Sequence, residues 1–496
     1  MNERFTLTLV ITTLIFLCSI NISYTQWIYQ NIPKEINFVL SIDFIDSQYG
    51  AGAGNNFQGN FSGRAIYTTN GGNSWMSAIV PDSSRTLITI QFVNSTTGYS
   101  SGAYNLFFND KNFPVEQNRS TVFSSDYFRT NNEMIRGINT NALGEYKGLF
   151  FKTTDRGQSW NAFGNLPDSV YYLVGLNFIN ENKGFATALF DHSGGVDDRI
   201  IKTTNGGSSW FQSPMPDVIN SLRNIFFTDD NNGYSVGYKI ISDTPRAVIL
   251  KTINSGISWT LQIFPTTFNF NNINFSNSTT GFVIGNAAVK SPMSVIYKTT
   301  NAGVNWNLLP LQLKGIFLES IKFVPGTGVG FACGSREEIF AGSRIFTTKT
   351  TDYGQTWNHQ ILSDSGFAVN NFLLDQNNWY MSSFYFDHSF ILHSTNSGTG
   401  ISSINNSVPD DFQLNQNYPN PFNPSTKIKF QISKLTVVNL FVYDILGKEV
   451  KTIVNEELQP GTYEAEFDAT NLTSGIYFYK ITAGNFSEVR KMLLIK

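Results

Sequence analysis

The chain has 496 residues, more than one ordinary domain needs, and 41% of them are hydrophobic. Only 14% are charged and the net charge is −3, so no excess of basic charge is available to attract nucleic acid or acidic lipid. The sequence also lacks the motifs of phosphate-binding loops, nucleophile elbows and metalloprotease helices. These features argue against a nucleic-acid-binding protein and against the common enzyme classes that short motifs reveal.

The first 25 residues have the pattern of an export signal. Arg4 supplies a basic start, residues 7–20 form an apolar segment, and Ser23 and Thr25 are small residues before an expected cleavage at Gln26. An uncleaved anchor is the alternative, but the apolar segment is shorter than the roughly twenty residues that span a membrane. No later stretch of the sequence is long and apolar enough for a span.

The two cysteines exclude a disulfide framework. Cys18 lies inside the signal segment, where the bulky Leu17 before it argues against a lipoprotein. Cleavage would leave Cys333 alone, so the mature chain has no intramolecular disulfide and no zinc site built on cysteines. We therefore expect an exported protein that is stabilised by its core and needs no cofactor or metal.

An eight-residue motif, called the box below, recurs six times. It begins with Thr, has Asn or Asp third and Gly fifth, and ends with Trp. The copies are residues 68–75, 153–160, 203–210, 252–259, 299–306 and 350–357. From Trp160 onward, successive box tryptophans are 47 to 51 residues apart. This is the period of one four-stranded blade of a β-propeller.

A second motif, an apolar run followed by glycine and an aromatic residue, interleaves with the box. It occurs in residues 42–54, 90–102, 176–188, 225–237, 273–285 and 321–334, with a degenerate seventh copy in 372–383. The second motif has seven copies but the box has six, and the N-terminus explains the difference. Trp27 lies 48 residues before Trp75, and the segment that contains it matches the strand that follows a box. We expect this strand to complete the last blade, which closes a seven-bladed, all-β propeller over residues 26–400.

The residue types of the box suit a tight turn. Its Asn or Asp accepts a hydrogen bond from a nearby backbone N–H, its glycine takes a left-handed conformation, and its tryptophan covers the turn. These residues are Asn70, Gly72, Trp75, Asp155, Gly157, Trp160, Asn205, Gly207, Trp210, Asn254, Gly256, Trp259, Asn301, Gly303, Trp306, Asp352, Gly354 and Trp357. The motif resembles the Asp-box of sialidases, related glycosidases and photosystem II assembly factors. The resemblance implies hairpins remote from any active face, and hence a structural role for all of these residues.

The opposite face of such a propeller carries the loops between strands 2 and 3 and between blades, where function usually lies. An insertion between Ala103 and Lys147 belongs to it, as a lid over the central channel or as a surface loop. Two loops of this face share the sequence Phe-Asp-His-Ser, which includes Asp191, His192, Asp387 and His388. A calcium site in the first of these loops is one interpretation, and polar turns inherited by duplication are the other. A basic residue also recurs where strand 3 begins, at Arg64, Lys147, Arg199, Arg246 and Arg344. These residues predict either a cationic rim for an anionic glycan or solvated strand ends.

Two functions are compatible with this face, and a scaffold that binds no small ligand is a third possibility. The first is binding of an extracellular protein or glycan without catalysis. The second is a glycoside hydrolase with a carboxylate pair, as in sialidases, but the Arg-Ile-Pro motif that this resemblance requires is absent. No catalytic residue can be named from the sequence.

The last part of the chain follows a predicted linker at residues 401–411. Residues 412–496 begin with the proline-rich run Tyr418–Pro424 and continue with strand patterns at 427–432, 437–443, 461–467, 475–481 and 488–495, which favour a small antiparallel sandwich. A turn between strands is expected at residues 444–450.

Five stretches of this region carry a family resemblance, at residues 417–426, 442–447, 461–463, 474–479 and 491–496. Together they resemble the type A sorting domain of type IX secretion. The resemblance implies that the type IX machinery is a partner and that the protein is released or attached to the outer surface of the outer membrane. The alternative is a fibronectin-like binding module.

Overall fold

The computed structural model describes residues 27–56, 62–81, 86–104, 147–192, 195–287, 292–311, 313–338, 342–376, 378–385, 388–394, 401–405, 409–434, 436–458, 460–469 and 472–496. The expected signal segment and most of the insertion lie outside these ranges. Within them, the regular structure consists of nine four-stranded antiparallel sheets. No helix there is long and apolar enough to cross a membrane.

Seven of the described sheets are built from residues 27–394 on one plan. The first three are β2 (Phe38–Phe44), β3 (Gly50–Asn56), β4 (Ser62–Thr68) and β5 (Met76–Ser77); β6 (Thr86–Phe92), β7 (Gly98–Tyr104), β8 (Lys147–Thr153) and β9 (Asn161–Ala162); and β10 (Val170–Phe178), β11 (Gly184–His192), β12 (Gly195–Thr203) and β13 (Phe211–Gln212). The next three are β14 (Ser221–Phe227), β15 (Gly233–Ile241), β16 (Thr244–Thr252) and β17 (Thr260–Ile263); β18 (Phe268–Phe275), β19 (Gly281–Ala287), β20 (Ser294–Thr299) and β21 (Asn307–Leu308); and β22 (Ile316–Phe323), β23 (Gly330–Glu338), β24 (Gly342–Thr350) and β25 (Asn358–Ser365). The last has β26 (Phe367–Leu373), β27 (Trp379–Tyr385), β28 (His388–Ser394) and β1 (Trp27–Gln30).

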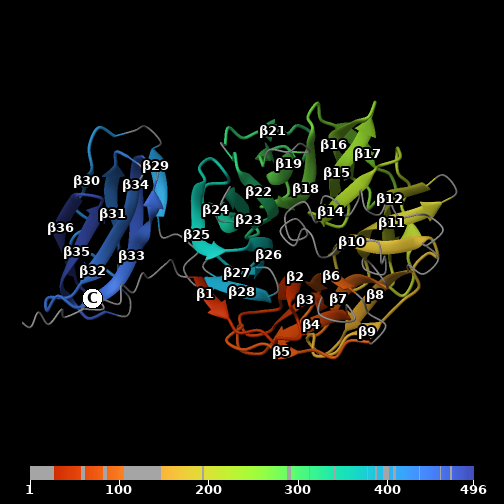
Figure 1. Cartoon of the computed structure of the whole chain (residues 1–496), viewed down its shortest axis with the longest axis horizontal. Coiled ribbons are helices and arrows are strands. Elements are labelled where there is room, and N and C mark those ends of the chain that lie inside the picture. The colour runs from red at the N-terminus through yellow and green to blue at the C-terminus, as the bar shows by residue number, and fades with distance from the viewer. Residues whose placement is uncertain are drawn as a thin grey trace, which may run out of the picture.

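These sheets follow one another in a propeller-like arrangement (Figure 1). The first strand of each sheet contacts the first strand of the next, and β26 contacts β2 in the same way. The N-terminal strand β1 pairs antiparallel with β28, with Trp27 opposite Ser394. Trp27 is buried and its ring lies 5.6 Å from that of Phe331, so this strand packs against the sheet before the last one as well. The structure thus places the N-terminal strand where the repeat period predicts it.

Every first strand carries a β-bulge about three residues from its start. In four of the seven sheets, the polar residue that follows the bulge accepts a hydrogen bond from a backbone amide of the next sheet. Ser41 Oγ accepts from the amide of Ile90 at 3.2 Å, and Asn272 Oδ1 accepts from that of Ile321 at 3.3 Å. Asn370 Oδ1 accepts from the amide of Ile42 at 3.4 Å. The last and first sheets are therefore joined by the same kind of bond as three other pairs of neighbouring sheets.

A second row of such bonds lies near the end of the first strands. The side chain before the terminal Phe of one first strand accepts a hydrogen bond from the amide of the terminal Phe of the next. Asp43 accepts from the amide of Phe92 at 2.5 Å. Gln91, Asn177 and Asn274 accept equivalent bonds. Burial raises the pKa of Asp43 to about 7, although the Phe92 hydrogen bond and the charge of Lys322 act in the opposite direction. The one acid of this row holds its proton far more tightly than an exposed aspartate does.

The second sequence motif has a packing explanation. The Phe that ends a first strand lies over the glycine that starts the second strand, so that a Cβ on Gly281 would lie 2.5 Å from Phe275. The same ring meets the box tryptophan, with Phe275 and Trp306 centroids 6.0 Å apart. Equivalent pairs occur in the other five boxed sheets at 5.8 to 6.5 Å. Glycine is therefore needed there for space rather than for a special backbone conformation.

Each box is held by its first residue, a buried threonine. Its Oγ1 accepts from the amide of the box glycine at 2.8 to 3.0 Å and donates to the box Asn or Asp at 2.7 to 3.0 Å. The Asn or Asp oxygen then accepts the amide of the residue before Trp at 2.9 to 3.0 Å. All six box glycines have positive φ, for example +82° at Gly72. The expected turn geometry is present, and the threonine is a member that sequence reasoning did not single out.

The C-terminal part is a two-sheet sandwich beside the propeller-like body (Figure 1). One sheet contains β29 (Ile401–Asn405), β34 (Gly461–Asp468), β31 (Ser425–Ile432) and β30 (Gln413–Leu414). The other contains β33 (Glu449–Leu458), β32 (Thr436–Tyr443), β35 (Gly475–Ala483) and β36 (Phe486–Leu494). The facing sides form one core that includes Phe430, Leu440, Tyr479 and Met492.

Two expectations for this region need correction. Residues 401–405, predicted as linker, form β29 on the edge of β34, because main-chain pairing to an open edge does not require an apolar side-chain pattern. The turn predicted at residues 444–450 is shorter, since β33 begins at Glu449. Strand β33 was missed because its pairing with β32 contains two register shifts, which break the two-residue alternation that identifies a strand.

Crowding at the motif glycine can be tested with Gly281→Ala. The added methyl group must displace the Phe275 ring, and overpacking of this kind costs about 1–3 kcal/mol of unfolding free energy. Phe275→Leu removes the obstructing ring, so the double variant should lose less stability than the sum of the two single variants. Denaturant unfolding of all four proteins measures this coupling. Strict additivity would show that the ring does not require the glycine.

The raised pKa of Asp43 predicts a pH effect. Because its pKa is about 7 in the folded chain and 3.8 in the reference state, the folded protein binds the proton more tightly, and stability falls as the pH rises from about 4 to 7. Asp43→Asn keeps the acceptor for the Phe92 amide and removes this loss. Its advantage over wild type should be larger at pH 8 than at pH 5 by on the order of 2 kcal/mol, measured by denaturant unfolding. Asn177→Asp should gain the same loss of stability as the pH rises. If the unfolding free energies of wild type and Asp43→Asn have the same pH dependence, this assignment is contradicted.

Candidate functional site

A pocket of about 520 Å³ lies beside the third sheet. Its wall comes from β12, β13 and the segment that leads to β14. The lining residues are Asp197, Asp198, Arg199, Gln212, Ser213, Pro214, Met215, Pro216, Asp217 and Val218. The β11–β12 hairpin and the β13–β14 connection lie at the same end of their antiparallel strands, opposite the box turns. The pocket is therefore on the face that the sequence analysis favours for function.

Arg199 is held in place on this wall. Its Nε lies 2.9 Å from Asp197 Oδ1, and its Nη1 donates to Gln212 Oε1 at 3.1 Å. The guanidinium also lies 5.4 Å from the centre of the Phe190 ring. A pre-oriented guanidinium loses little entropy when it binds a ligand oxygen. The charge of Asp197 next to it means that the pair presents donors and acceptors together rather than a bare cation.

Two further aspartates have defined structural partners. Asp198 is buried, and its Oδ2 accepts from the amide of Leu222 at 2.6 Å, which ties β12 to the first strand of the next sheet. Asp217 lines the pocket, and its Oδ1 lies 2.5 Å from Lys239 Nζ. The hydrogen bond from Lys239 lowers the pKa of Asp217 below its usual value, with the amide of Val218 acting in the same direction. Asp217 is thus a fixed carboxylate, and it is charged at neutral pH.

Apolar groups complete the wall of the pocket. Met215 packs against the core cluster that contains Ile219, Leu222 and Trp259, while Pro214, Pro216 and Val218 border the polar residues. Val218 is 58% exposed. A surface that alternates fixed hydrogen-bonding groups with apolar faces can bind a ligand that is itself both polar and apolar, such as a saccharide ring.

Of the five basic residues proposed as a rim, only Arg199 lines this pocket. Arg64 donates to the carbonyl of Gly63 at 3.2 Å, and Arg246 and Arg344 each stand opposite another basic residue, Lys239 and Arg336. The side chain of Lys147 lies outside the described part of the chain. These positions share a strand parity, but they do not all contribute to the pocket.

The Phe-Asp-His-Ser loops are described only in part. Asp191 and His192 belong to β11, yet their side chains lie outside the described set, as does Asp387. His388 is exposed, with its ring 6.1 Å from Tyr385. Among the described side chains, no group of three His, Cys, Asp or Glu residues is arranged to hold a metal. The calcium interpretation therefore has no support in the described residues.

A recurrent feature of the box face was missed in the sequence. A lysine precedes the box threonine in five of the six boxes, at Lys152, Lys202, Lys251, Lys298 and Lys349. Each ammonium lies 5.1 to 5.8 Å from an aromatic ring centre. The Lys-Thr dipeptide at the start of these five boxes was the available signal.

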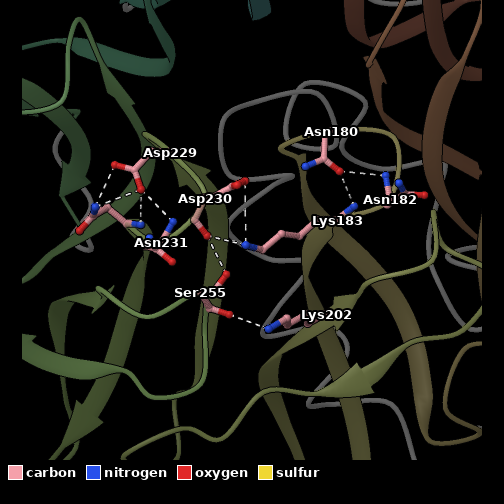
Figure 2. Close-up of polar contacts among 9 residues, drawn as sticks. Asn180, Asn182, Lys183, Lys202, Asp229, Asp230, Asn231 and Ser255 are labelled. Atoms are coloured by element: carbon pink, nitrogen blue, oxygen red, sulfur yellow. Dashed lines mark hydrogen bonds and ion pairs between the residues drawn. The ribbon is translucent and has the colours of Figure 1, made fainter.

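Figure 2 shows how one of these lysines joins neighbouring sheets. Lys202 of β12 donates to the carbonyl of Ser255 in the next box at 2.8 Å, and Lys183 donates to the carbonyl of Asp230 at 2.6 Å. Ser255 Oγ donates to that same Asp230 carbonyl at 2.6 Å. Burial lowers the pKa of Lys202, with the nearby charge of Lys183 adding to the effect. These lysines hold sheets together on the box face and are not part of the pocket.

No curated protein matches the chain. Solved structures with a similar fold include a protein of unknown function from Dyadobacter fermentans, 8% identical over 75% of this chain and 98% of that one, with a TM-score of 0.43. A polysaccharide lyase, an ulvan lyase of family PL25 bound to a GlcA–Rha3S oligosaccharide, is 8% identical over 75% and 96%, with a TM-score of 0.47. The endosialidase of phage phi92 is 12% identical over 95% and 87%, with a TM-score of 0.41.

The C-terminal part has a family match. Residues 416–496 match the secretion system C-terminal sorting domain. These residues contain six of the eight strands of the two-sheet sandwich, β31 to β36. The chain therefore carries a type IX secretion sorting domain and is a secreted or cell-surface protein.

Proposed function

We propose that this protein is a closed, seven-bladed Asp-box propeller that the type IX machinery delivers to the cell exterior, where it binds a glycan without catalysis. Seven similar sheets, the pairing of β1 with β28 and the bond from Asn370 to Ile42 support a closed ring. The threonine-centred turns support a structural role for the boxes. After delivery, the mature protein is released or attached to the outer surface of the outer membrane.

The pocket beside Arg199 is the observation that carries the ligand proposal. It is a concave site on the loop face, and it combines a fixed guanidinium, an amide and carboxylates with the apolar Met215 and prolines. Sugar hydroxyls both donate and accept hydrogen bonds, and the C–H faces of a sugar ring pack on apolar groups. The pocket offers both kinds of contact within about 520 Å³, a volume typical of small-ligand sites.

Glycoside hydrolysis is less well supported than binding. A hydrolase needs a carboxylic acid with a raised pKa beside a second carboxylate. In this pocket, the pKa of Asp217 is lowered and Asp198 is buried against the Leu222 amide. Asp43 has a raised pKa, but its Oδ2 accepts the Phe92 amide in a position that Asn and Gln occupy in other sheets. The Asp43 carboxyl group is therefore explained by its hydrogen bond between two sheets and not by catalysis.

Arg199→Gln tests the binding proposal. A neutral amide cannot replace the paired guanidinium, and loss of a charged hydrogen bond costs about 1.5–3 kcal/mol, so affinity for an array-identified glycan should fall roughly tenfold to a hundredfold. The probe is an array of neutral, carboxylated and sulfated glycans, followed by calorimetry with the best one. Arg64→Gln is the matched control, since Arg64 has the same offset from its box but lies outside the pocket. Equal affinity of wild type and Arg199→Gln, or an equal loss in both variants, would refute binding at this pocket.

A further inference from the structure

The pocket beside Arg199 has hydrogen-bond donors on one wall. Arg199 uses its Nε for Asp197 and its Nη1 for Gln212, and its Nη2 donates to no acceptor within the described part of the chain. Gln212 is exposed, and its Nε2 likewise has no acceptor among the described residues. Guanidinium and amide nitrogens donate hydrogen bonds and do not accept them. This wall therefore offers N–H donors to a ligand.

The segment before β14 adds a fixed acceptor. The amide of Asp198 donates to the carbonyl of Ile219 at 3.1 Å, which holds this segment alongside β12. Asp217 Oδ1 accepts from the amide of Val218 at 2.8 Å and lies 2.5 Å from Lys239 Nζ of β15. Its Oδ2 accepts no hydrogen bond from the residues that the structure describes, and 41% of the side chain is exposed. A carboxylate only accepts, so the ligand group that meets Asp217 must be a donor.

Acidic side chains outnumber basic ones in the pocket. Three of the lining residues are aspartates, and Arg199 is the basic residue among them. Lys239, which bonds to Asp217, adds a second cation and leaves one acidic side chain in excess. Arg199 is paired with Asp197 and Lys239 with Asp217, so an incoming anion meets no unpaired cation of these two. Like charges placed together in a binding site disfavour the ligand that carries them and so give specificity.

We propose that the pocket beside Arg199 selects a neutral saccharide over one that carries carboxylate or sulfate groups. It rests on the glycan binding stated under Proposed function and names the class of glycan. Neighbouring hydroxyls of a neutral sugar accept from Arg199 and Gln212 and donate to Asp217, since every hydroxyl both donates and accepts. A sulfate or carboxylate group accepts from Arg199 but has no proton to donate to Asp217, and its charge repels that carboxylate.

Calorimetry with matched glycans and the full-length protein tests this selectivity. The probes are gluco-, galacto- and manno-oligosaccharides of equal length, each as the neutral chain and as a sulfated and a carboxylated counterpart. The best neutral chain should bind roughly tenfold more tightly than its own anionic counterparts, because these meet the excess of acidic side chains. Its affinity should change less than about twofold when NaCl is raised to about 0.5 M, since salt screens interactions between charges.

Asp217→Asn tests the source of the selectivity. The amide keeps an acceptor for Val218, removes the negative charge and leaves Lys239 without its partner, so the roughly tenfold preference for the neutral chain should disappear. Asp230→Asn is the matched control, because Asp230 is paired with Lys183 between the same two sheets but on the box face (Figure 2). This control should keep the selectivity of wild type. Unchanged selectivity in Asp217→Asn would refute the role of its carboxylate.

Two outcomes distinguish this proposal from the proposed function. If wild type binds an anionic chain more tightly than its neutral counterpart and Arg199→Gln weakens that binding, glycan binding at the pocket stands and the neutral selectivity is refuted. If no chain binds, or if Arg199→Gln binds every chain as wild type does, the proposed function fails at this pocket and the selectivity fails with it.

Discussion

Neighbouring sheets of the propeller-like body are linked by hydrogen bonds between a backbone amide of one first strand and a polar side chain of its neighbour. An amide on an innermost strand has little access to water, and leaving such a group unpaired costs about 1–3 kcal/mol. Ser41, Asn272 and Asn370 each supply an acceptor after a bulge, so the bulge and the polar residue work together. Asn370 makes this bond to Ile42, so the last sheet contacts the first through the same kind of bond as three other neighbouring pairs. Strand β1 pairs with β28, whose edge would otherwise be open.

The box end and the loop end of the sheets have different roles. At the box end, each box threonine bonds to the amide of the box glycine and to the box Asn or Asp, and Lys202 donates to a carbonyl of the next box. At the loop end, hairpins and inter-sheet connections vary in length, and the pocket beside Arg199 arises where β12 meets residues 213–218. Its aspartates are held by bonds to Leu222 and Lys239. Rigid polar groups of this kind suit recognition, because their hydrogen bonds are already oriented when a ligand arrives.

Much of the architecture was predictable because it repeats. The spacing of the tryptophans indicated four strands per unit, and the distance from Trp27 to Trp75 indicated that β1 belongs to the last sheet. The site was less predictable, because strand parity locates a side chain on a face but does not show its partners. Arg199 differs from Arg64 only through Asp197, Gln212 and the segment after β13, which are not part of the repeat. Strand β29 was missed for a related reason, since backbone pairing at an edge leaves little trace in the sequence.

Hydrogen–deuterium exchange of β28 tests the closed ring most directly. The amides of β28 that face β1 should exchange slowly in the intact chain, because β1 pairs along residues 391–394. Removal of residues 27–30 leaves this edge open, and exchange of the same amides should become at least tenfold faster. Equal exchange rates in the intact and shortened chains would show that the N-terminal strand does not complete the last sheet.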